Sequence, residues 1–242
     1  MRFVVVSDIH ANYEALEGIL ADVGNLEIDR YVSLGDLVGY YAEPQECIDR
    51  FRGLNGLCIQ GNHDAVASGV EEPLDFNPLA TDRIFWTRGQ LRPESKKWLA
   101  ELPTQGKLTE DIWAVHGSLR NRDEYLMSQM VIQANFFLME KLQAPRTVLF
   151  GHTHRRAVYR LDGTIVSTLS EKRFRLREEN RYLINPGGSG QPRDGEPGAP
   201  YLMIDDDRVE LRRAPYDVEA AAAKVAKLPY GDILADRLRQ GI

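Results

Sequence analysis

The sequence has few cysteines and no long apolar run. Cys47 and Cys58 stand in unrelated contexts without a Cys-x-x-Cys pair, which excludes a disulfide framework and a cysteine-based zinc site. The apolar run Phe3 to Val6 is far too short for a signal peptide or a membrane span. We therefore expect buried free thiols, a cytoplasmic location and no membrane partner.

The sequence also lacks an excess of positive charge. Its 36 aspartates and glutamates outnumber its 30 lysines and arginines, which leaves a formal net charge of -6. A mildly acidic surface repels a polyanion, so we expect no strong nucleic-acid-binding surface. No internal repeat or low-complexity linker divides the 242 residues, and we expect a single domain over residues 1–242. A homo-oligomer is compatible with this composition.

What the chain does contain is a series of short apolar runs that end in polar clusters. In the first half, helical patterns follow such runs, as is typical of βα units. Residues 65–105 show helical patterns and no strand, which predicts a helical insertion. From residue 156 onward, short alternating runs predict antiparallel hairpins, and residues 218–240 predict a helical tail. The pattern is that of an α/β fold with mixed sheets.

All five histidines of the sequence follow the ends of predicted strands: His10, His63, His116, His152 and His154. Asp8, Asp36 and Asn62 stand at the same kind of position. In open α/β sheets, the carboxyl ends of strands converge on one crevice. Since chance does not readily place every histidine at a strand end, we predict that these side chains form one functional site.

The residue types at these positions indicate the chemistry. Imidazoles mixed with carboxylates, without thiolates, favour Mn, Fe, Zn, Ni or Co. Asp8 and His10 are two residues apart and can face the same ion, whereas His152 and His154 can diverge at a turn and serve two ions. The ligands are too many for one metal. We therefore expect two divalent transition-metal ions.

The same residues carry a resemblance to a known family. The motifs are, in order, Asp8-x-His10, Gly35-Asp36, Gly61-Asn62-His63-Asp64, His116-Gly117 and Gly151-His152-Thr153-His154. This set resembles that of the calcineurin-like metallophosphoesterases. Asn185-Pro186-Gly187 also resembles the loop that closes the site in the small bacterial, phosphodiesterase-type branch.

The resemblance implies both a fold and a role for each motif residue. The fold would be a four-layer α/β/β/α sandwich with the metals at one edge of the sheets. The first ion would be held by Asp8, His10, Asp36 and His154, and the second by Asp36, Asn62, His116 and His152. Asp36 would bridge the ions. His63 would be the catalytic histidine, oriented by Asp64.

The function predicted from this set is hydrolysis of small or nucleotide-derived phosphodiesters, by in-line attack of a water that both ions activate. After Gly35-Asp36 the chain continues Leu37-Val38-Gly39-Tyr40-Tyr41 and lacks the Asp-Arg-Gly of the protein-phosphatase branch. That departure argues against a protein phosphatase. A phosphomonoesterase or a nuclease with the same metal site is the alternative. A non-catalytic scaffold, as in the retromer subunit of similar fold, is disfavoured because His63 and every expected ligand are present.

Three further residues are candidates for substrate binding. Asn12 can bind phosphate or cap the following helix. Tyr41, with its neighbour Tyr40, can stack on a leaving group or pack in the core. Arg193 can reach phosphate or lie in a solvated turn, and Arg122 is a second source of positive charge.

Overall fold

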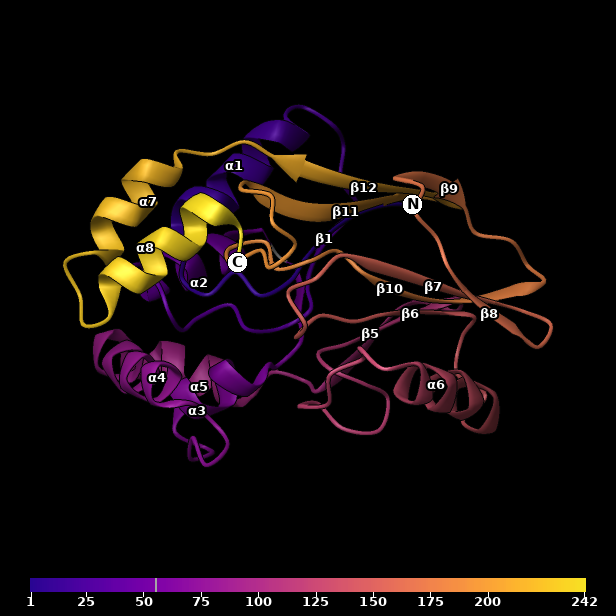
Figure 1. Ribbon diagram of the computed structural model, residues 1–242, viewed down its shortest axis with the longest axis horizontal. Helices are drawn as coiled ribbons and strands as arrows, with labels where there is room; N and C mark the ends of the chain where they lie inside the picture. The colour runs from indigo at the N-terminus through magenta and orange to yellow at the C-terminus, as the bar shows by residue number, and fades with distance from the viewer. Residues whose placement is uncertain (55) are drawn as a thin grey trace.

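The computed structural model describes residues 1–54 and 56–242 and contains two mixed six-stranded sheets (Figure 1). The first sheet comprises, in spatial order, β3 (Leu57–Cys58), β2 (Arg30–Ser33), β1 (Arg2–Val6), β11 (Ala199–Asp205), β12 (Arg208–Ala214) and β9 (Arg173–Arg175). The second comprises β4 (Gln105–Thr109), β5 (Ile112–Val115), β6 (Thr147–Leu149), β10 (Asn180–Asn185), β7 (Ala157–Asp162) and β8 (Ile165–Thr168).

The two sheets pack face to face and are covered by helices on their outer faces. Side chains of β1 alternate between the two interfaces: Phe3 and Val5 join the core between the sheets, and Val4 and Val6 join the core under the helices. Helices α1 (Tyr13–Val23) and α2 (Pro44–Gly53) cover the first sheet, and α6 (Gln129–Lys141) covers the second. This arrangement confirms the predicted four-layer sandwich.

Helices gather at one end of the sheets (Figure 1). The predicted helical insertion, residues 65–105, covers most of α3 (Asn62–Ser68) and all of α4 (Pro78–Gln90) and α5 (Pro93–Ala100). The tail, predicted to be helical, contains two helices: α7 (Val218–Val225) and α8 (Gly231–Gln240). Tyr230, in the left-handed region at φ 58°, separates them. The flanking Pro229 and Gly231 are the sequence signals of that break.

Strand direction brings the predicted site together. Strands β1, β2 and β3 run parallel in the first sheet, and β5, β6 and β10 run parallel in the second. Their carboxyl ends therefore lie at a common edge of each sheet. None of the helices described is both long and apolar enough to cross a membrane.

Candidate metal centre

The predicted ligands meet where these strands end. Asp8 follows β1, Asp36 follows β2, His116 follows β5, and His152 and His154 follow β6. These five and His10 are at most 5% exposed, and Asn62 is half-buried at the start of α3. Three groups of side chains have ligand atoms within 4.8 Å of one another: Asp8, His10 and His154; His10, Asp36 and His63; and Asp36, His116 and His152.

The backbone is strained at these residues. Among the described residues, ten that are not glycine have positive φ, and five of them are predicted ligands: Asp8, His10, Asp36, His152 and His154. The left-handed region is unfavourable for such residues and persists where surrounding structure enforces it. Strain concentrated in this way is typical of a functional site.

The first ligand group lies around His10. Its Nε2 is 3.1 Å from Nε2 of His154, which is in turn 3.4 Å from Oδ1 of Asp8. That Asp8 oxygen is buried and has no hydrogen-bond partner, whereas Oδ2 accepts a hydrogen bond from Ser7 Oγ at 2.5 Å. Three atoms that could coordinate a metal ion, two imidazole nitrogens and one carboxylate oxygen, thus lie close together.

The second ligand group lies around His116. Its Nε2 is 3.1 Å from both Nδ1 of His152 and Oδ1 of Asn62. Oδ2 of Asp36 is 3.4 Å from this nitrogen and 3.7 Å from Nε2 of His10. Asp36 therefore stands between the two groups, where a bridging carboxylate is expected.

Each of these four histidines uses its other ring nitrogen to contact a backbone carbonyl. The contacts are His10 Nδ1 to Val38 O at 3.1 Å, His116 Nδ1 to Leu34 O at 2.8 Å, His152 Nε2 to Asp123 O at 3.1 Å and His154 Nδ1 to Gln191 O at 2.7 Å. A carbonyl only accepts, so the proton is on the outer nitrogen of each neutral ring. The inward nitrogen then presents a lone pair, as in a metal-ligating histidine.

These residues fit a pair of metal ions. The facing lone pairs of His10 and His154 repel one another, and the orphaned Oδ1 of Asp8 adds a buried acceptor without a donor. Two ligands on one ion, each about 2.1 Å from it, stand about 2.9–3.4 Å apart in octahedral or tetrahedral geometry. The imidazole contacts at 3.1 Å fall within that range.

The electrostatics of the site favour the metal-binding forms of most ligands. Burial lowers the pKa of His10 and His154 well below the usual value and that of His152 to about 3. Burial also opposes ionisation of Asp36, but neighbouring histidines, His116 first, outweigh it and lower its pKa. His116 itself is buried, yet Asp36 and Asp8 raise its pKa to about 9, so this predicted ligand would have to lose a proton to bind a metal ion.

His63 lies beside the ligands but differs from the other histidines. Its ring is 4.7 Å from that of His10 and 4.5 Å from that of Phe76, centroid to centroid. Its Nδ1 is buried without a hydrogen-bond partner, so no carbonyl fixes this ring. Gly39 makes room for it, since a Cβ there would be 2.5 Å from the same nitrogen.

Asp64 does not orient His63, and that part of the prediction is wrong. Its carboxylate accepts backbone N–H groups from Asp36 (2.8 Å), Leu37 (3.0 Å), Val38 (3.3 Å) and Gly61 (3.0 Å). The side chain points back from the first turn of α3, as an acidic residue at the third helical position does. Asp64 therefore holds the turn that carries Asp36.

Two of the substrate-binding candidates are structural instead. Asn12 caps α1 by accepting the N–H of Ala15 and donates to Gly190 O and Tyr216 Oη, so its amide is fully used. The Tyr41 side chain is 2% exposed and its hydroxyl accepts a hydrogen bond from Gln191. Neither side chain is available to a substrate.

A cavity of about 140 Å³ opens beside His63, Asn62 and His152. Its walls include Tyr40, Phe76 and Tyr125, and Tyr125 stacks on His152 with ring centroids 4.1 Å apart. Tyr40 therefore takes the position that was expected for Tyr41. Phe76 and Tyr125 come from loops and show no motif by which the sequence could have identified them.

The two candidate arginines differ in their surroundings. Arg122 is bound to Glu71 and Asp123, so its charge is already neutralised. Arg193 makes no ion pair within the described part of the chain; its backbone donates to His154 O, and its guanidinium donates to Gln191. Burial raises the pKa of Tyr125, and the charge of Arg193 opposes this shift.

Comparisons with known proteins agree with this geometry. Residues 1–207 match the model of the calcineurin-like phosphoesterase superfamily domain. An uncharacterised protein of Methanocaldococcus jannaschii, MJ0912, is 34% identical over 98% of this chain and 97% of its own. The crystal structure of a metallophosphoesterase from Sphaerobacter thermophilus, also 34% identical, superposes with a TM-score of 0.84 over 100% of this chain and 99% of its own.

A third similar structure shows the fold at lower identity. The hypothetical protein PH1004 from Pyrococcus horikoshii is 19% identical, with a TM-score of 0.80 over 100% of this chain and 98% of its own. The four-layer fold and these matches lead to one assignment: the chain belongs to the calcineurin-like phosphoesterase superfamily, whose members are divalent-metal-dependent phosphoester hydrolases.

Proposed function

We propose that this protein is a phosphodiesterase that acts on small or nucleotide-derived diesters. The observation that carries the proposal is the convergence of four inward histidine nitrogens on the carboxylates of Asp8 and Asp36. In the reaction, a water molecule loses one proton as its oxygen forms a bond to phosphorus, the bond from phosphorus to the leaving oxygen breaks, and the leaving oxygen takes up a proton.

The proposed cofactor is a pair of divalent ions of Mn, Fe, Zn, Ni or Co. Asp8, His10, Asp36 and His154 would hold one ion, and Asp36, Asn62, His116 and His152 the other. When bound, such a pair lowers the pKa of a water and neutralises charge on the phosphoryl oxygens. Asp36 and Asp8 are the anionic ligands, so two divalent ions leave a net positive charge that attracts phosphate.

His63 is the proposed source of the proton for the leaving oxygen. It lines the cavity beside Asn62 and His152, where the leaving group would lie. Burial lowers the pKa of His63 to about 4, so the ring is neutral near pH 7 in the free chain. A phosphate anion beside the ring opposes that shift, because negative charge favours the imidazolium form.

The charges around the cavity support a preference for diesters. Asp75 and Asp123 contribute acidic side chains to the wall; Asp123 is paired with Arg122, whereas Asp75 forms no ion pair within the described residues. A diester carries one negative charge and a monoester up to two, so repulsion by these carboxylates acts more strongly on the monoester. The aromatic walls, Phe76 and Tyr125, suit a flat group such as a nucleobase.

Matched substrates test the proposal. We would measure kcat/KM for bis(p-nitrophenyl) phosphate and p-nitrophenyl phosphate on protein of known metal content. The diester is expected to be preferred by at least about tenfold, with activity lost on chelation and restored by Mn. A preference for the monoester would overturn the diester assignment, and full activity in metal-free protein would overturn the metal mechanism.

A further inference from the structure

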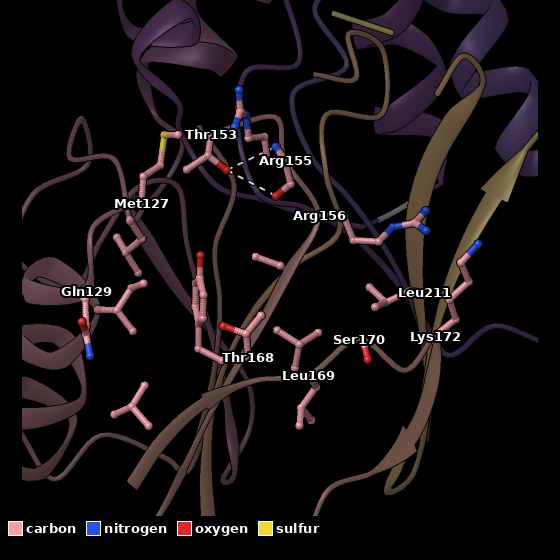
Figure 2. A pocket seen from close by; sticks show the side chains of 16 residues that line it. Met127, Gln129, Thr153, Arg155, Arg156, Thr168, Leu169, Ser170, Lys172 and Leu211 are labelled. Carbon is pink, nitrogen blue, oxygen red and sulfur yellow. Dashed lines mark hydrogen bonds between the residues drawn. The ribbon is translucent and has the colours of Figure 1, made fainter. Parts of the chain in front are cut away.

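A second cavity lies outside the metal centre, between the amino end of α6, strands β7 and β8, and the segment 168–172 that crosses to the first sheet (Figure 2). Its volume is about 650 Å³, compared with about 140 Å³ beside His63. This volume is within the range of sites that hold a small organic ligand. None of the predicted metal ligands lines it.

The cavity wall is positively charged in a protein of net negative charge. Arg155, Arg156 and Lys172 line it, and no aspartate or glutamate does. None of these three cations forms an ion pair within the described residues, although carboxylates outnumber basic residues in the sequence. A wall of unpaired cations is suited to an anion.

Arg156 has an unused donor at this wall. Its Nη2 donates to the carbonyl of Arg212 at 2.6 Å, but its Nε is buried and has no hydrogen-bond partner. A buried N–H group without an acceptor is unfavourable, and an anionic oxygen in the cavity would provide one.

The rest of the wall combines apolar side chains with the polar side chains of Gln129, Thr153, Thr168 and Ser170. Met127 lies on one side in Figure 2, Leu169 near the middle, and Leu211 beside Lys172 on the other. Tyr159 of β7 also contributes. Apolar walls with a few convergent polar groups are typical of small-molecule sites, and the flexible thioether of Met127 adapts to different shapes.

We propose that this cavity binds a small organic phosphate whose anionic head lies at Arg156 and Lys172 and whose alkyl or aryl body lies against Leu169 and extends toward Met127. The Arg155 side chain points away from these two cations (Figure 2). Two cations match a phosphate dianion better than a single carboxylate, which one arginine can bind alone. The assignment does not depend on whether the metal centre prefers monoesters or diesters.

The cavity is adjacent to the proposed metal centre. Thr153, which stands between His152 and His154, forms part of the wall. Its hydroxyl exchanges hydrogen bonds with the backbone of Arg155, at 3.2 and 3.3 Å (Figure 2), and accepts another from Asn185 at 3.1 Å. The bound phosphate would thus lie next to the segment that carries two predicted ligands.

Methionine methyl NMR on the full, metal-loaded chain tests the proposal. The probe is hexylphosphonate, whose carbon–phosphorus bond a phosphoesterase does not hydrolyse. Met127 lines the cavity, whereas Met130, also exposed at the start of α6, does not. We expect a saturable shift of the Met127 methyl resonance in the millimolar range or below, and an unchanged Met130 resonance.

Charge variants separate this site from general attraction. The pair Arg156→Gln and Lys172→Gln is expected to weaken binding by at least about tenfold, because it removes charge-assisted contacts. Lys141→Gln removes an exposed lysine elsewhere on α6 and is the matched control, with unchanged affinity expected. Ligand-free spectra that retain the wild-type methyl positions show that each variant is folded.

Several results would overturn the proposal. These are the absence of a Met127 shift, an equal loss of affinity in Lys141→Gln, and unchanged affinity in the double variant. Hexanol or inorganic phosphate producing the same shift at the same concentration would also overturn it, because the site would then recognise only one half of the ligand.

Discussion

The carboxylate of Asp64 accepts the backbone N–H of Asp36 at 2.8 Å and so fixes the residue that stands between the two ligand groups. Asp36 has a φ of 53°, in the left-handed region that a non-glycine residue rarely adopts. Four backbone donors meet the two oxygens of Asp64, and this network holds the strained turn in place. Asp64, which is not a predicted metal ligand, thus positions the proposed bridging carboxylate.

Asp64→Asn is expected to weaken both the fold and the metal centre. The amide has one acceptor oxygen, and its NH₂ group would face backbone N–H groups, so two buried donors lose their acceptor. The cost is at least about 2 kcal/mol in the free energy of unfolding, with a fall in metal content. Asp82→Asn, on the exposed side of α4, removes the same charge and is the control. Equal denaturation midpoints for Asp64→Asn and wild type would refute this role.

Asp36→Asn is expected to cost more than any other ligand change. A shared carboxylate places two ions and balances their charge, so metal stoichiometry and turnover should fall together. Asp8→Asn is the matched comparison, because Asp8 belongs to one ligand group only. We expect Asp8→Asn to lower the metal occupancy of one site and to leave the occupancy of the other site unchanged. Elemental analysis of both variants measures the number of ions per chain. An Asp36→Asn protein that keeps both ions with near-normal turnover would contradict the bridging assignment.

The convergence of the proposed metal ligands could be predicted because the local pattern determines their position. Parallel strands end at one edge, so residues directly after β1, β2, β5 and β6 had to meet. The direction of a side chain is harder to predict. Tyr40 and Tyr41 are adjacent, yet Tyr40 lines the cavity and Tyr41 packs in the core, because Tyr40 has a left-handed φ of 49° that the sequence does not reveal.

For β4 and for the role of Asp64, the sequence contains only weak signals. Gln105–Thr109 forms the edge strand β4, although only Leu108 is buried there, so no apolar run marks it. Asp64 follows Gly61 by three residues, the spacing of an acidic residue that caps a helix start. The contacts of Phe76 and Tyr125 depend on loops that close over the site, and local patterns do not encode such tertiary contacts.

In metal-free protein, the free energy of unfolding is expected to depend on pH through His63. Its pKa is about 4 in the fold, chiefly through burial, and about 6.5 unfolded, so the unfolded chain binds more protons as pH falls. Stability from this group is present above pH 6.5 and decreases toward pH 4. Between pH 7 and pH 5 the loss is about 2 kcal/mol.

His63→Gln isolates this contribution. Buried Asp8 and Asp64 have raised pKa values, about 6 and about 7, and act in the opposite direction, but they are common to both proteins. The difference in free energy of unfolding between variant and wild type, from urea titrations in chelator, is expected to move in favour of the variant by about 2 kcal/mol at pH 5. A difference independent of pH would show that His63 is not held neutral by burial.

The last prediction separates a proton-donating His63 from a metal-ligating one. His63→Ala is expected to retain both ions, because the other four histidines have their outer nitrogens fixed by carbonyl groups and His63 has none. Turnover of an alkyl or nucleoside diester is expected to fall by about 10²- to 10⁴-fold. A p-nitrophenyl diester should lose much less, since nitrophenolate leaves without being protonated. His116→Ala is the matched control, with a loss of metal and an equal effect on both substrates. Metal loss in His63→Ala would make His63 a ligand, and an equal loss of turnover for both leaving groups would exclude it as the proton donor.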